Sequence, residues 1–127
     1  MTLDEAIFTA LSAHAGVTAI AGDRSYPVQA PQSAALPFVV WQRVSTSPIN
    51  SHDGPAALDQ TSVQFACFAA TFTAAHDLRN AIRAALEDVA LGNSARGIVT
   101  NIRDTVENEP VPPVFRSDVD IDFIAAP

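Results

Sequence analysis

The sequence contains no lysine, one cysteine and only five glycines among its 127 residues. A single thiol, Cys67, excludes an internal disulfide and is typical of proteins from a reducing compartment. No run of about 18 apolar residues is present, which argues against a membrane-spanning helix. The segment from Met1 to Glu5 lacks the basic residues that begin a secretory signal. We therefore expect a protein that stays in the cytoplasm and does not bind a membrane.

Motifs for catalysis, metals and cofactors are also missing. The glycines are scattered, so no phosphate-binding loop is formed, and His14, His52 and His76 lack the spacing of a zinc site. The His52–Asp53 pair could act as an acid–base pair, but no nucleophile motif accompanies it. Turn formation by Asp53 and its neighbours explains the pair better. We predict no catalytic residue, no metal and no cofactor.

Cys67 could in principle be a nucleophile. A reactive cysteine needs a polar and partly exposed site, whereas Cys67 shares one strand face with Val63 and Phe65. We therefore expect a buried structural cysteine.

The charge balance points away from nucleic-acid binding. Fourteen acidic residues against seven basic ones give a formal charge of −7. Gripping DNA by its phosphates needs a basic face, whereas an acidic surface allows DNA to pass without sticking. The hydrophobic content of 48% and the length together predict one globular domain over residues 1–127.

Two helices stand out in the N-terminal and central parts of the chain. Thr2 and Glu5 have capping-box spacing before an apolar repeat that includes Leu11. A short second turn should end at Gly22. The strongest helix is predicted for about residues 73–90, with Thr73 as its N-cap and Gly92 as its stop. Its apolar stripe consists of Leu78, Ala81, Ile82, Ala85, Leu86 and Val89, with Arg79 and Arg83 on the outer side.

Alternating apolar residues predict the strands. A brief extended segment covers residues 25–28, and longer strands cover 38–44 and 61–69. Two more strands close the chain, one with Ile98, Thr100, Ile102 and Val106 on a shared face and one with Phe115, Val119, Ile121 and Phe123 on a shared face. The prediction is an α+β fold, with a mainly antiparallel sheet of about four to five strands. The N-terminal helix and the long helix should pack on one face of that sheet.

A segment rich in turn formers separates the two central strands. We predict a long projecting loop at about residues 46–59, too long for a tight hairpin turn. Loops held between rigid strands often bind partners, so this one is a candidate assembly loop. Its candidate residues are Pro48, Ile49, Asn50, His52, Asp53, Gly54 and Pro55.

Asp118, Asp120 and Asp122 fall on one face of the last strand, about 7 Å apart in succession. A solvated strand face is the first interpretation, an acidic wall facing a channel the second, and a cation site the third. A calcium loop would need glycine at its sixth position, where this chain has Phe123.

Two stretches of sequence resemble a known family. The first is AGDRSYP at residues 21–27 followed by AALPFVVWQRV at residues 34–44. The second is DGP at residues 53–55, then VQFACFA at residues 63–69, continuing into the central helix. In order and spacing they are similar to the tail-completion proteins of long-tailed bacteriophages, prophages and gene transfer agents, which act as tail terminators.

This resemblance implies a structural virion protein without enzymatic activity. It implies a homo-oligomer, typically a hexameric ring, that caps the tail tube at the head-proximal end of the virion and contacts the head or neck connector. DNA would pass through without specific binding, and Asp118, Asp120 and Asp122 are candidates to line the lumen. A head-completion or neck adaptor protein is the alternative, and a small ligand-binding domain or hydrolase is a more distant one.

Overall fold

The computed structural model describes residues 2–31, 35–51, 54–92, 95–107 and 113–125, without the side chains of residues 49–51, 54–58 and 125. The elements follow the predicted order of two helices, three strands, one helix and two strands. They are α1 (Leu3–Ala13), α2 (Ala15–Ala21), β1 (Ser25–Pro27), β2 (Phe38–Ser51), β3 (Gly54–Ala69), α3 (Phe72–Leu86), β4 (Arg96–Glu107) and β5 (Val114–Ala125).

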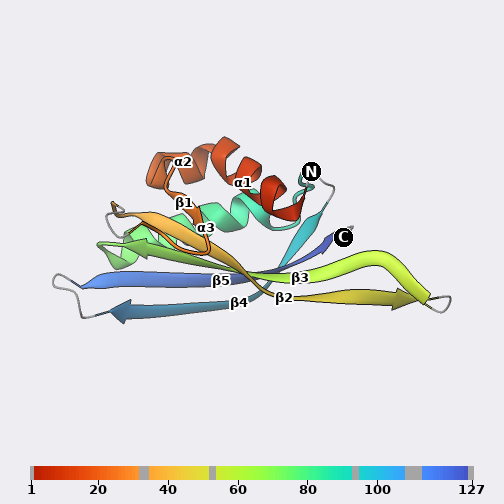
Figure 1. The fold of residues 1–127 in the computed structure, drawn as a ribbon. Helices are drawn as coiled ribbons and strands as arrows, with labels where there is room; N and C mark the ends of the chain where they lie inside the picture. Colours follow the sequence, from red (N-terminus) through yellow and green to blue (C-terminus); the bar gives the residue numbers. More distant parts are fainter. Residues whose placement is uncertain (1, 32–34, 52–53, 93–94, 108–112, 126–127) are drawn as a thin grey trace.

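The predicted α+β architecture is confirmed. One five-stranded sheet has the order β1-β2-β3-β5-β4, in which only the β1–β2 pair is parallel. The three helices of the described residues lie on one face of the sheet (Figure 1). The core lies between these two layers, with Phe65 and Phe123 among its largest fully buried side chains. None of the helices described combines the length and hydrophobicity that a membrane span requires.

The first helix begins as the sequence predicts. The Thr2 hydroxyl accepts a hydrogen bond from the Glu5 amide at 3.2 Å and donates to the Glu5 carboxylate at 3.1 Å. His14 caps α2 because its Nδ1 accepts a hydrogen bond from the Val17 amide at 3.4 Å. Gly22 ends α2 with φ of 58°, in the left-handed region that favours glycine.

The central helix is shorter than predicted at its C-terminal end. Its N-cap is Thr71, whose hydroxyl accepts from the Ala74 amide at 3.1 Å, rather than Thr73. It ends at Leu86 rather than near residue 90, because the Asp88 amide turns away to donate to the Gly97 carbonyl at 2.9 Å. Bonding to β4 therefore replaces the next turn of helix.

The loop predicted for residues 46–59 is wrong. β2 continues to Ser51 and β3 begins at Gly54, and these two residues pair with each other, so the segment is a long hairpin. Pro48 is tolerated because the outer part of β2 has no strand on its other side in the described structure, and edge strands accept proline. In Figure 1 this hairpin extends beyond the helices at one end of the sheet.

The face assignment of β4 is also wrong at its start. The register shifts between Val99 and Asn101, which marks a bulge at Thr100. Ile98 therefore lies opposite Asp122 on the open face, and it is 61% exposed. Gly97 takes the core position instead, where a Cβ would come within 2.7 Å of Ile121 Cγ2.

Candidate assembly site

The outer hairpin is built from polar and apolar residues with almost no charge. From Val44 to Ser51, β2 carries no charged residue, and Val44 is 63% exposed. At its base, the Thr46 and Thr61 hydroxyls lie 3.3 Å apart across the strand pair. Among the predicted loop residues, Pro48 lies in β2 and is exposed, while His52 and Asp53 lie outside the described residues. The sequence thus located the projecting element but not its strand structure.

The open face of the sheet, opposite the helices, carries the three aspartates of β5. Asp118 is only 6% exposed, so the solvated face that we preferred is wrong for this residue. Its Oδ1 accepts a hydrogen bond from Arg116 Nε at 2.7 Å, and its Oδ2 accepts from Gln64 at 3.4 Å. Arg103 on β4 lies 3.9 Å from the same carboxylate. This partnership with Asp118 raises the pKa of the Arg116 guanidinium.

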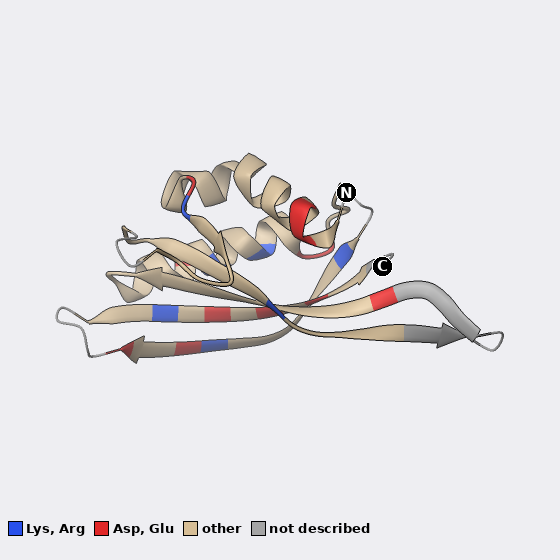
Figure 2. Ribbon diagram, viewed as in Figure 1, with Lys and Arg blue, Asp and Glu red and all other residues tan. Residues whose placement is uncertain are grey.

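The next two aspartates are also paired. Arg103 Nη2 lies 3.7 Å from Asp120 Oδ2. Asp122 accepts from the Ser62 hydroxyl at 2.6 Å and from Gln60 at 3.0 Å. Figure 2 shows this mixture of positive and negative residues along the middle of β4 and β5. The negative charge of the open face is therefore partly offset by two arginines, and within the described residues no group of His, Cys, Asp or Glu could hold a metal.

A second polar cluster ties α3 to the sheet edge on the helix side. Asp104 on β4 accepts from the Ser117 hydroxyl at 2.6 Å and from Arg79 at 3.2 Å, and His76 Nε2 lies 3.1 Å from its other oxygen. The hydrogen bond from Ser117, with His76 and Arg79 beside it, lowers the pKa of the Asp104 carboxyl. Arg79 is thus largely buried, with 12% of its side chain exposed, although helical spacing had placed it on the outer side.

The cluster brings together a serine, a histidine and an aspartate, yet not in the order that nucleophilic catalysis needs. The Ser117 hydroxyl donates to the carboxylate rather than to the imidazole, and Ser117 is fully buried. A catalytic serine instead donates to its histidine base. The arrangement therefore acts as a clamp between α3, β4 and β5. Only the register of β4 against β5, which pairs Asp104 with Ser117, could have revealed it.

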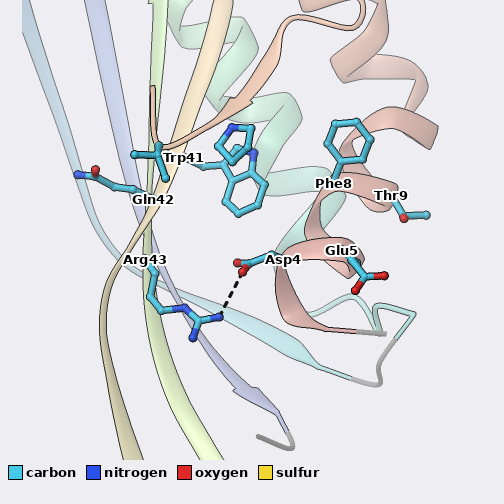
Figure 3. Close-up of a pocket in the computed structure, with 9 residues that line it drawn as sticks. Asp4, Glu5, Phe8, Thr9, Trp41, Gln42 and Arg43 are labelled. Carbon is cyan, nitrogen blue, oxygen red and sulfur yellow. Dashed lines mark ion pairs between the residues drawn. The ribbon is translucent and has the colours of Figure 1, made fainter. Parts of the chain in front are cut away.

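A shallow groove of about 530 Å³ lies between α1 and β2 (Figure 3). Its lining includes Phe8 and Trp41, with Asp4 and Arg43 forming an ion pair at 3.6 Å on its rim. Phe8 is 49% exposed, whereas Trp41 is buried. The accessible surface of the groove is mainly apolar, and the Asp4 carboxylate and the Arg43 guanidinium on its rim are paired with each other.

Cys67 lies near the C-terminal end of β3 and is fully buried, as predicted. Burial, followed by the neighbouring negative charge of Asp118, raises the pKa of the Cys67 thiol far above its ordinary value. The thiol therefore stays protonated at neutral pH, unlike the thiolate of a reactive cysteine.

Comparisons with known proteins agree with the architecture. A solved structure described as the virion of a native gene transfer agent particle contains a chain with the same fold, at a TM-score of 0.75 and 19% identity. The match covers 98% of this protein and 95% of that chain. A search of curated proteins finds no match. Residues 5–125 match the family described as tail completion protein gp17. Because this match spans nearly the whole sequence, the protein belongs to the gp17 tail-completion family, a family of structural virion components.

Proposed function

We propose that the protein is a tail terminator, which forms a hexameric ring on the end of the tail tube and joins the tail to the head. The observation that carries this proposal is the family match over residues 5–125. The likeness to a chain of a gene transfer agent virion supports it, since the two folds correspond over almost their full lengths. The role is structural rather than enzymatic, and it requires no cofactor.

The outer hairpin is our candidate for the contact with the tail tube or with a neighbouring subunit. It projects beyond the helices, as Figure 1 shows, so a partner can reach it without disturbing the core. Its exposed residues Val44 and Pro48 are apolar, and the sequence continues apolar at Ile49 and Leu58. Exposed apolar surface on a projecting element is typical of an interaction site.

The open sheet face is our candidate for the lumen wall. Asp118, Asp120 and Asp122 lie on this face, but Arg103 and Arg116 offset part of their charge. The remaining bias is acidic, and a ring of six copies would carry a formal charge of about −42. Such a wall would repel DNA phosphates weakly and would not bind them, which suits passage of DNA without specific binding.

Imaging the protein with its two possible partners tests the proposal. Purified tail tubes and purified head connectors are each incubated with the protein and examined by electron microscopy. We expect a ring at one end of each tail tube, which stops further growth of the tube. Binding to the connector with no effect on tubes would instead indicate a neck adaptor, and binding to neither would contradict both functions.

A further inference from the structure

The last strand of the sheet, β4, has an unpaired outer edge. At the start of β4, the Asp88 amide donates a hydrogen bond to the Gly97 carbonyl. From Ile98 to Glu107, no described strand pairs with the outer edge of β4. Its apolar side chains are uncovered as well: Ile98 is 61% exposed and Val106 is 46% exposed. A long edge of this kind presents a row of backbone donors and acceptors to any strand that approaches.

Apart from the bulge at Thr100, the features that normally guard such an edge are absent or turned inward. β4 contains no proline and no lysine. Its charged side chains after the bulge bond back toward the body of the protein: Arg103 to Asp118 and Asp120, and Asp104 to α3 and Ser117. Charges that could repel an added strand are therefore held over the sheet instead of along its edge.

On the other side of the sheet, the outer part of β2 forms a second open edge. The short β1 pairs only with Val39–Trp41, and the Val28 amide bonds to the Trp41 carbonyl, so β2 is uncovered from Gln42 onward. Pro48 has no amide hydrogen to donate. The proline-free stretch is therefore Gln42–Ser47, which is close to the usual length of a strand. It contains one bulge at Val44, where the register against β3 shifts between Arg43 and Ser45.

We propose that β4 of one copy pairs with the outer part of β2 of the next copy. This inference rests on the proposed ring. Within one copy β2 and β4 are antiparallel, because each of the three intervening pairings reverses direction. A neighbour related by rotation about an axis roughly along the strands keeps its strand directions. Its β2 would therefore meet β4 antiparallel, and the sheet would continue without a change of pattern.

This pairing is head-to-tail, since it joins two different edges, and such contacts close into rings when the rotation allows. A closed sheet has no edges left, which removes the aggregation risk of β4. It also fixes the two sides of the ring. Because every helix lies on one face, one wall of the closed sheet is helical and the other is the open face with Asp118, Asp120 and Asp122.

Cross-linking of single-cysteine variants tests the pairing, because the native Cys67 is buried and does not compete. Thr46→Cys on β2 is mixed with Ile102→Cys or Val106→Cys on β4, all of which lie on the helix side of the sheet. Disulfides need the two Cα atoms within about 7 Å. The mismatched control mixes Thr46→Cys with Asn101→Cys, which pairs opposite Asp120 on the open face.

We expect mixed dimers from at least one same-face combination under mild oxidation, and none from the mismatched control. Oxidation is carried out on free protein at high concentration and on protein bound to tail tubes. Dimers formed by Val106→Cys alone would show that β4 pairs with itself, which would overturn the inference. A ring without mixed dimers would also overturn it while leaving the tail-terminator function intact, whereas failure to bind tubes would count against the function.

A charge placed on the β4 edge provides an independent test. Val106→Lys puts an ammonium group beside the proposed junction, while Val89→Lys makes the same change at a position 40% exposed that lies outside the strand edges. We expect Val106→Lys to weaken association at least about tenfold, equivalent to about 1.4 kcal/mol, and Val89→Lys to leave it unchanged. Equal association of the two folded variants would overturn the inference.

Discussion

The inner and outer halves of the β2–β3 pair share one strand pairing but serve different purposes. Near the helices, Val39 and Phe65 are fully buried and form the core with α1 and α3. Beyond Arg43 the hairpin leaves the helices, and its described residues Val44 and Pro48 are exposed. One strand pair therefore serves folding at one end and, in our account, assembly at the other. Changes in the two halves should have separable effects.

The largest loss of stability should come from the core half. Phe65→Ala removes a fully buried ring that packs beside Trp41. We expect the free energy of unfolding to fall by about 3–5 kcal/mol, measured by urea denaturation. Phe8→Ala, at a ring that is 49% exposed, should cost far less. Similar losses for both variants would show that the helix layer does not define the core as described.

Gly97→Ala should have the next largest effect. The added Cβ would lie 2.8 Å from the Leu86 carbonyl oxygen and 2.9 Å from Phe123 Cε1, so the end of α3 must shift away from β4. We expect a loss of about 1–3 kcal/mol in the free energy of unfolding, seen as a lower thermal midpoint. An unchanged midpoint would mean that the contact between β4 and α3 is loose.

The clamp at Asp104 should contribute less, and its contribution should depend on pH. The partners of Asp104 lower the pKa of its carboxyl in the folded protein. The ionised carboxylate therefore stabilises the fold at pH values above the unfolded pKa, which is about 3.9. This stabilisation is lost as pH falls through the lower, folded value. We expect Asp104→Asn to cost about 0.5–1 kcal/mol at pH 6, because the carboxylate is partly exposed.

Urea unfolding at pH 6 and at pH 3 checks the sign of this effect. The difference in stability between wild type and Asp104→Asn should shrink at the lower pH. Asp88→Asn is the control, since Asp88 also pairs with an arginine but its side chain is 88% exposed. A difference that grows on acidification would contradict the lowered pKa.

Shortening the hairpin should have the smallest effect on stability. The register pairs Ser47 with Gln60, so an Asn-Gly turn can join these two residues in place of residues 48–59. We expect the free energy of unfolding to change by about 0.5 kcal/mol or less, since this part lies outside the core. Assembly on tail tubes should be lost, as measured by co-sedimentation. Unfolding of the variant would show that the hairpin serves folding instead.

Local patterns in the sequence predicted most of the fold. Alternation in β5 and helical spacing in α3 were sufficient because both elements bury one face, and the Thr2–Glu5 cap depends only on neighbours along the chain. The outer hairpin was missed because Pro48 and Gly54 usually signal turns, although a strand with an open edge tolerates them. At the edge of a sheet, proline and glycine therefore do not distinguish a turn from a strand.

The remaining errors arise from contacts between distant residues. The bulge at Thr100 changes which side chains of β4 face the core, and the sequence alone does not specify the register that produces it. The burial of Asp118 depends on Arg103 on β4 and on Arg116 on β5, which both lie beside its carboxylate. Alternation along the chain predicted that Asp118, Asp120 and Asp122 share one face of β5, as they do, but their pairing with Arg103 and Arg116 could only be learned from the register of the sheet.

The mass of the assembled protein tests the central claim most directly. Native mass spectrometry and light scattering over a concentration series, with and without short tail tubes, would compare the wild type with the shortened hairpin. We predict a closed ring near six copies for the wild type, and for the shortened variant, which keeps Gln42–Ser47, a ring that does not bind the tubes. A wild type that stays monomeric under both conditions, or a shortened variant that binds the tubes as the wild type does, would contradict the account.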